Sequence, residues 1–123
     1  MYGGMVLLWA FSSTGAVAQT QGEMNASAAR SYTTANSELA QAVALYGSRL
    51  HSQQLQLFKK SQRQWERFRT AACDFESSGV SGGSVRPMIQ AACLESLTRT
   101  RLLYIQKLAT CAEGDLSCPA WRR

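Results

Sequence analysis

Hydrophobic residues recur at spacings of three and four along three long stretches of the chain. The first, about residues 28–50, carries Tyr32, Ala35, Leu39, Val43, Tyr46 and Leu50. The second, about residues 53–76, carries Leu55, Phe58, Trp65, Phe68 and Ala72. The third, about residues 85–110, carries Ile89, Cys93, Leu97, Tyr104 and Leu108. This period is typical of helices that bury one face, so the pattern predicts three amphipathic helices.

Short polar segments separate the three stretches. His51 and Ser52 form the first connection, and residues 77–84, with three glycines and four serines, form the second. We expect Ser84 to cap the third helix and Pro87 to lie in its first turn, where proline is tolerated. Helices joined by such short links pack against their neighbours, so the expected fold is an all-α antiparallel bundle of three main helices.

The two ends of the chain differ from this helical domain, which we expect to span residues 28–110. Residues 1–18 hold a short apolar run that ends in Ala16-Val17-Ala18. This predicts a cleaved signal peptide, with a buried N-terminal helix as the alternative. The run is too short to span a bilayer. Residues 19–27 are small and polar, which predicts a flexible lead-in, and residues 111–123 are expected to be a disulfide-closed tail.

The chain contains four cysteines, Cys73, Cys93, Cys111 and Cys118. An even number in a short exported chain indicates disulfides, and four cysteines allow three pairings. We favour Cys73–Cys93, whose loop of about twenty residues is worth about 3 kcal/mol, together with Cys111–Cys118, which fixes the tail. A zinc site is the alternative, but no pair has C-x-x-C spacing and His51 is the only histidine.

The chain is basic, with 13 lysines and arginines against 8 aspartates and glutamates and a net charge of +5. An exported basic protein seldom meets nucleic acid, so we expect an acidic protein partner or an anionic envelope surface. Lys59, Arg63 and Arg67 are spaced by four and line one helix face, which is either solvated or a docking surface. No nucleophile, base and orienting group can be assembled, so neither enzyme activity nor a cofactor is expected.

Three segments of the sequence share their pattern with one family. They are residues 61–73 (SQRQWERFRTAAC), the loop Gly82-Gly83-Ser84, and residues 93–101 (CLESLTRTR). Together they resemble the lysozyme inhibitor LprI-like family of small exported bacterial proteins. That family's pattern is an A-Q-x-x-W-x-x-[FY]-R-D-x-x-C helix, a G-G-S loop and a C-x-x-x-L-T-x-x-R helix. Residues 36–39 (NSEL) are similar to its D-x-E-L-N segment, and the resemblance covers residues 35–108.

The chain departs from the family pattern at three positions. Asn36 and Thr70 stand where the family has aspartate, and Ala40 stands where it has asparagine. The resemblance implies a helical domain with a disulfide between Cys73 and Cys93. It also implies inhibition of, or protection from, enzymes that attack the cell wall.

Two arginines, Arg69 and Arg101, lie on or beside the apolar stripes. A guanidinium there needs a partner, because an unpaired buried charge is costly. We expect Glu38 to be the acceptor and the Gln62 amide to bridge, in a polar network that ties the three helices together. The alternative is that these four residues form the polar floor of a binding cleft. Trp65 is expected to belong to the core.

The functional hypothesis is an exported inhibitor or immunity-type protein, periplasmic or secreted, that binds a peptidoglycan-acting enzyme. Gly82, Gly83 and Ser84 either serve only the turn or enter the partner's cleft, since a braced loop loses little entropy on binding. Trp121, beside two arginines, is a candidate interface anchor. Animal-type lysozymes are themselves basic, so charge repulsion favours a different wall enzyme with an acidic surface. The alternatives are an envelope interaction or structural protein, or a periplasmic chaperone, without a wall-enzyme target.

Overall fold

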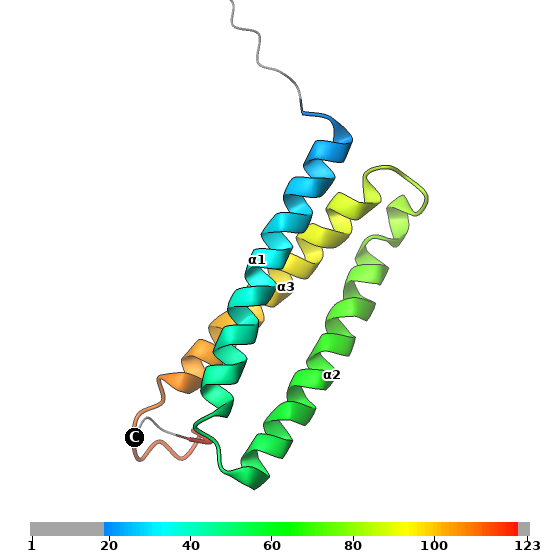
Figure 1. Ribbon diagram of the computed structural model, residues 1–123. Coiled ribbons are helices and arrows are strands. Elements are labelled where there is room, and N and C mark those ends of the chain that lie inside the picture. The colour runs from blue at the N-terminus through cyan, green and yellow to red at the C-terminus, as the bar shows by residue number, and fades with distance from the viewer. Residues whose placement is uncertain (1–18, 121–123) are drawn as a thin grey trace, which may run out of the picture.

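A computed structural model describes residues 19–120; the expected signal peptide and Trp121 lie outside the described residues. The chain forms three long helices, α1 (Gln21–Gly47), α2 (Ser52–Glu76) and α3 (Arg86–Ala109), with a short 3₁₀ turn, η1 (Ser78–Val80), after α2. Within the described range there is no strand. Helices α1 and α3 run in the same direction and pack closely together, and α2 runs antiparallel to both (Figure 1). The expected all-α bundle is confirmed.

Helix α1 begins earlier than the hydrophobic pattern predicts. Thr20 caps it, because the Thr20 hydroxyl oxygen accepts a hydrogen bond from the backbone N–H of Glu23 at 3.1 Å. Residues 21–27 therefore form the first turns of the helix, and the prediction of a flexible lead-in was wrong for them. The helix ends at Gly47, where α2 comes close: a Cβ on Gly47 would lie 3.4 Å from Cδ1 of Leu55.

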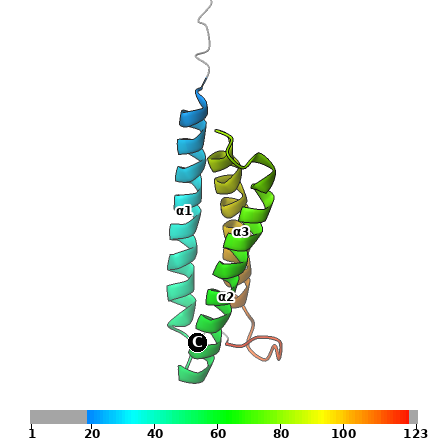
Figure 2. The same cartoon turned by 90° about the vertical axis from the view of Figure 1, so that its right-hand side faces the viewer.

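The hydrophobic core lies where the C-terminal halves of α1 and α3 meet the N-terminal half of α2. Leu39 and Tyr46 of α1 are buried against Leu102 and Ile105 of α3, and α2 covers them with partly buried aromatic side chains. From the side, α2 and α3 lie next to each other beside α1 (Figure 2). Burying apolar side chains of this size stabilises the fold by about 1.5–3 kcal/mol each.

The buried faces of α2 and α3 are rotated relative to the predicted stripes. On α3 the buried residues are Ala91, Cys93, Thr98, Leu102 and Ile105, whereas Ile89 and Tyr104 are exposed. On α2 the predicted core residue Phe68 is 59% exposed. Polar residues explain both errors. Thr98 occupies the centre of the buried face of α3, and Gln62 and Arg69 occupy that of α2, so hydrophobicity alone misplaced both faces.

Both expected disulfides are confirmed. The Cys73–Cys93 bridge joins the last turns of α2 to the second turn of α3, with Cα atoms 5.6 Å apart. The Cys111–Cys118 bridge closes the tail after α3, with Cα atoms 5.9 Å apart. The tail is also held to α2, because Nε2 of Gln54 donates a hydrogen bond to the carbonyl oxygen of Pro119 at 2.6 Å.

Candidate functional site

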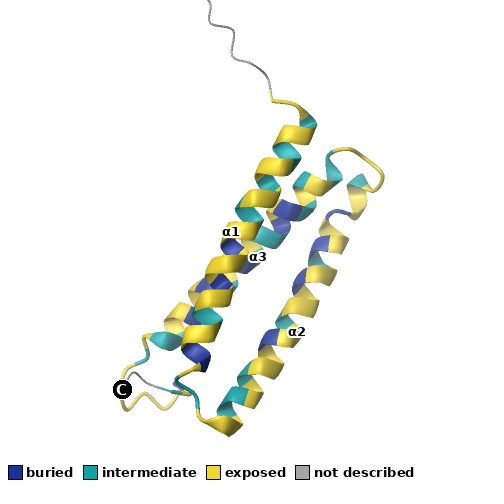
Figure 3. Ribbon diagram, in the orientation of Figure 1, coloured by how far each residue is buried: buried dark blue, intermediate teal, exposed yellow. Residues whose placement is uncertain are grey.

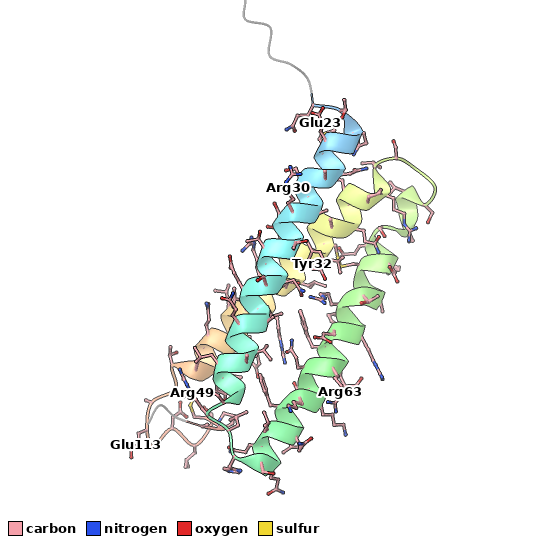
Figure 4. The ribbon with its side chains drawn as sticks, viewed as in Figure 1. Glu23, Arg30, Tyr32, Arg49, Arg63 and Glu113 are labelled. Carbon is pink, nitrogen blue, oxygen red and sulfur yellow. A yellow bond between two sulfur atoms is a disulfide. The ribbon has the colours of Figure 1, made fainter. Side chains whose placement is uncertain are left out.

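Arg69 of α2 is buried in the middle of the bundle and contacts all three helices. Its Nη1 donates hydrogen bonds to Oδ1 of Asn36 on α1, at 2.9 Å, and to Oγ1 of Thr98 on α3, at 3.0 Å. Its guanidinium carbon lies 4.8 Å from the ring centroid of Trp65 and 5.5 Å from that of Tyr32. Tyr32 points from α1 towards α2 (Figure 4). Arg69 thus joins the helices through neutral acceptors and aromatic faces.

Arg101 of α3 lies near the same tryptophan. Its guanidinium carbon is 5.6 Å from the Trp65 centroid, its Nε donates to Oε1 of Gln62 at 3.1 Å, and its Nη2 donates to Oγ of Ser61 at 3.2 Å. Burial lowers the pKa of Arg101. In residues 19–120, neither Arg69 nor Arg101 forms an ion pair with a carboxylate. This guanidinium–tryptophan cluster (Gln62, Trp65, Arg69, Thr98 and Arg101) therefore carries positive charge held by neutral groups.

Glu38 is not part of that cluster, which corrects the expected network. Its carboxylate is about half-exposed and lies 3.7 Å from Nη1 of Arg99, whose Nε also pairs with Glu95 at 2.9 Å. The reason is helical geometry. Glu38 lies two residues beyond Asn36, which turns it by about 200° away from Arg69. Asn36 and Thr98 supply the acceptors that Glu38 was expected to supply.

Asn36→Asp should stabilise the fold by about 1 kcal/mol, because a hydrogen bond between two charged groups contributes more than one with a neutral acceptor. The carboxylate would stand where Oδ1 of Asn36 already meets Arg69 at 2.9 Å. The gain should be present at neutral pH and disappear in acid, once the carboxylate is protonated. Urea unfolding of both proteins at the two pH values checks this. A gain that persists in acid would assign it to something other than charge.

The outward face of α2 carries a line of exposed apolar side chains. Leu57 is 66% exposed, Phe68 59% and Phe75 79%. Phe68 follows Leu57 after about three turns and Phe75 after about five, so all three point within about 20° of one direction. Exposed residues follow the outer side of α2, and buried ones the side towards α1 and α3 (Figure 3). Three large apolar side chains aligned on a solvated helix are typical of an interaction site.

Basic residues also lie on the surface of α2: helical geometry places Lys60 and Arg67 within about 60–80° of this apolar line, and Lys59 and Arg63 about 120–160° from it. Lys59, Lys60, Arg63 and Arg67 are all exposed, and Arg63 projects from the side of α2 away from α1 (Figure 4). None of the four forms an ion pair with another described residue. We call the three apolar residues together with Lys60 and Arg67 the α2 face. It combines an apolar line with unpaired positive charge, which complements a partner that presents apolar groups beside carboxylates.

The loop after α2 continues from the same end of the helix as Phe75. Gly82, Gly83 and Ser84 are exposed. Gly82 has φ +78°, a conformation that favours glycine, and a Cβ on Gly83 would lie 3.1 Å from the carbonyl oxygen of Val80. Ser84 does not cap α3, contrary to expectation: the N-cap is Val85, without a side-chain bond. The Ser84 carbonyl instead accepts a hydrogen bond from Nδ2 of Asn25 on α1, at 2.9 Å.

The other features considered from the sequence do not form a candidate site among the described residues. His51 is exposed at the start of α2, and residues 19–120 hold no group of three or more His, Cys, Asp or Glu side chains arranged to bind a metal. None of the described helices is both long enough and apolar enough to cross a membrane. Sequence reasoning missed Phe75, although its spacing from Leu57 and Phe68 marks a second apolar stripe on α2.

Comparison with known proteins assigns the family. The model of the family described as lysozyme inhibitor LprI matches residues 13–104. The uncharacterized protein R02472 of Rhizobium meliloti (strain 1021) is 37% identical over 60 residues, which make up 49% of this chain and 43% of that protein. The chain thus spans less than half the length of that curated relative. No solved structure matches the chain. Because the family model covers most of its length, the chain belongs to the lysozyme inhibitor LprI family.

Proposed function

We propose that the protein is an exported inhibitor or immunity-type protein that binds a peptidoglycan-acting enzyme, and that it does so through the α2 face and the adjoining loop 81–84. Family membership supports an inhibitor that acts on another protein. Two disulfides in so small a domain suit an oxidising compartment such as the periplasm or the outside of the cell.

The exposure of Leu57, Phe68 and Phe75 along one line of α2 is the observation that supports this location for the binding surface. Apolar side chains in such positions gain free energy when a partner removes them from water, at about 25 cal/mol per Å². Aromatic side chains are also frequent among the residues that dominate binding energy. The other large exposed apolar residues of the helices are less well aligned: Leu45 is on α1, and Ile89, Leu103 and Tyr104 of α3 spread over about 100°.

Charge selects the kind of target. The unpaired cations of the α2 face would repel a basic lysozyme and attract an enzyme whose surface is acidic around its cleft. We therefore favour a bacterial wall hydrolase or a wall-modifying toxin over an animal-type lysozyme. Binding to such a target should weaken as salt is added, because salt screens exposed charges beyond about 8–10 Å.

Lysis of a peptidoglycan suspension tests this proposal. The oxidised protein should slow lysis by a wall hydrolase with an acidic surface at a molar ratio near 1:1, and should act less on a basic animal-type lysozyme. A periplasmic chaperone would instead suppress aggregation of many unfolded proteins and leave lysis unchanged. No effect on any wall enzyme at large molar excess would contradict the proposal.

Ser84→Trp should weaken inhibition by about tenfold or more if the loop enters the partner's interface, because an indole on an exposed tight loop blocks close approach. The backbone bond from Asn25 to the Ser84 carbonyl is retained, so the helical circular dichroism should not change. Ser48→Trp is the matched control, an exposed serine in the turn at the other end of the bundle. Equal inhibition by the two variants would exclude the loop from the interface.

A further inference from the structure

A pocket lies at the end of the bundle remote from loop 81–84, where α1 ends, α2 begins and the tail returns. Its volume is about 320 Å³. The apolar part of its wall comes from Leu50, Leu57, Phe58, Leu108 and Pro119. Its polar part comes from Tyr46, Gln54, Ser61, Arg101 and Tyr104. All three helices and the disulfide-closed tail therefore contribute, which makes the pocket a feature of the tertiary fold.

Arg101 supplies a cation that is already oriented at this pocket. Its Nε and Nη2 are held by the neutral oxygens of Gln62 and Ser61, and its guanidinium carbon lies 5.1 Å from the ring centroid of Tyr104. Within residues 19–120 it has no carboxylate partner. A guanidinium offers five N–H donors, so donors remain for a planar anion, which it can bind through two parallel hydrogen bonds.

Tyr46 adds a second unfilled polar group. The residue is 2% exposed, yet its hydroxyl oxygen has no hydrogen-bond partner among the described residues. Burial raises the pKa of Tyr46, so the phenol stays neutral and keeps its proton to donate. A buried hydroxyl without a partner costs free energy, about 1–3 kcal/mol. A hydroxyl left in this state beside a pocket is understandable if a ligand completes its hydrogen bonding.

We propose that this pocket binds an amphipathic monocarboxylate, with the carboxylate at Arg101 and an alkyl chain along the wall formed by Leu50, Phe58 and Leu108. The size follows from the volume: a cavity of about 150 Å³ accepts benzene, so this pocket has room for about twelve non-hydrogen atoms. Decanoate has that size. The pocket is remote from the loop and shares only Leu57 with the α2 face. The proposal goes beyond the inhibition of a wall enzyme, and its test measures decanoate binding and not lysis, so either can fail alone.

Calorimetric titration of the oxidised protein with decanoate, below the concentration at which decanoate aggregates, tests this site. We expect one site with a Kd on the order of 10–100 µM, in keeping with a ligand of this size. Decanol and decyltrimethylammonium carry the same chain without the negative charge and should bind at least about tenfold more weakly. Binding of decanol as tightly as decanoate would overturn the proposal, because the cation would then play no part.

Variants locate the site. Arg101→Gln should weaken decanoate binding at least about tenfold, and Tyr46→Phe about fivefold, whereas Arg63→Gln on the outer side of α2 should leave it unchanged.

Because Arg101 also bonds Gln62, circular dichroism must show that Arg101→Gln is folded; if it is not, Tyr46→Phe and the comparison of head groups decide. Unchanged affinity in Tyr46→Phe and in folded Arg101→Gln would overturn the proposal. So would decanoate binding to Trp121→Ala but not to the unsubstituted protein, which would assign the pocket to the chain's own C-terminal residues.

Discussion

Phe68→Ser combined with Phe75→Ser should raise the protein concentration needed to halve wall lysis by about 100-fold. Phe68 and Phe75 are 59% and 79% exposed, so their side chains contribute little to the fold and are available to a partner. Removing two aromatic side chains from the centre of an interface should cost about 2.8 kcal/mol in total, at about 1.4 kcal/mol each, and each 1.4 kcal/mol is about tenfold in affinity. The stability of the double variant should change by about 1 kcal/mol or less, as for exposed positions generally.

The matched control is Leu45→Ser combined with Leu103→Ser. These leucines are 62% and 67% exposed on α1 and α3, so the control removes apolar surface of similar exposure away from α2. Inhibition by this control should match that of the unsubstituted protein. Equal loss of inhibition in both double variants would show that general surface hydrophobicity, and not the α2 face, governs binding.

Cys73→Ala combined with Cys93→Ala should lower the free energy of unfolding by about 3 kcal/mol. The bridge joins residues 20 positions apart, and cross-linking a loop of that length removes about this much chain entropy from the unfolded state. The bridge is also the covalent link between α2 and α3, and α2 otherwise contacts its neighbours through fewer residues than α1 and α3 share. The midpoint of thermal unfolding should fall by about 12–24 °C, at about 4–8 °C per kcal/mol for a domain of this size.

The comparison for this prediction is the pair Cys111→Ala and Cys118→Ala. That bridge joins residues 7 positions apart outside the helices, so its removal should cost no more than about 2.5 kcal/mol. Urea unfolding followed by circular dichroism measures both. If the tail bridge proves the more stabilising of the two, the attachment of α2 to the bundle does not depend on the Cys73–Cys93 link.

The sequence was sufficient to predict the three helices because their hydrophobic spacing is long and regular. Both favoured disulfides are present: Cys73 and Cys93 lie near the ends of α2 and α3 that the bundle brings together, and Cys111 and Cys118 close the tail after α3. Start and rotation of the helices were less predictable. Helix α1 begins at Gln21 and not near residue 28, because the Thr20 cap stabilises helix in residues 21–27 despite their polar composition. Thr98 and Arg69 are polar yet buried, so a stripe drawn from hydrophobicity alone was displaced.

The candidate site was predicted in part. The cations Lys59, Arg63 and Arg67 lie exposed on α2, as their spacing of four indicated. The acceptor for Arg69 was assigned to Glu38 because Glu38 belongs to the segment that resembles the family pattern, whereas the structure places the amide of Asn36 there. The role of Phe68 could not be predicted, because an apolar residue on an amphipathic helix is expected to face the core. Its exposure emerges only once Trp65 and Arg69 occupy the inner face.

Amide hydrogen exchange of the oxidised protein, with and without the hydrolase that it inhibits, tests most directly whether the α2 face binds a wall enzyme. Exchange should slow along α2 from Leu57 to Phe75 and in loop 81–84, with α1 unchanged. Protection confined to α1 and α3, with no change along α2, would contradict binding through the α2 face.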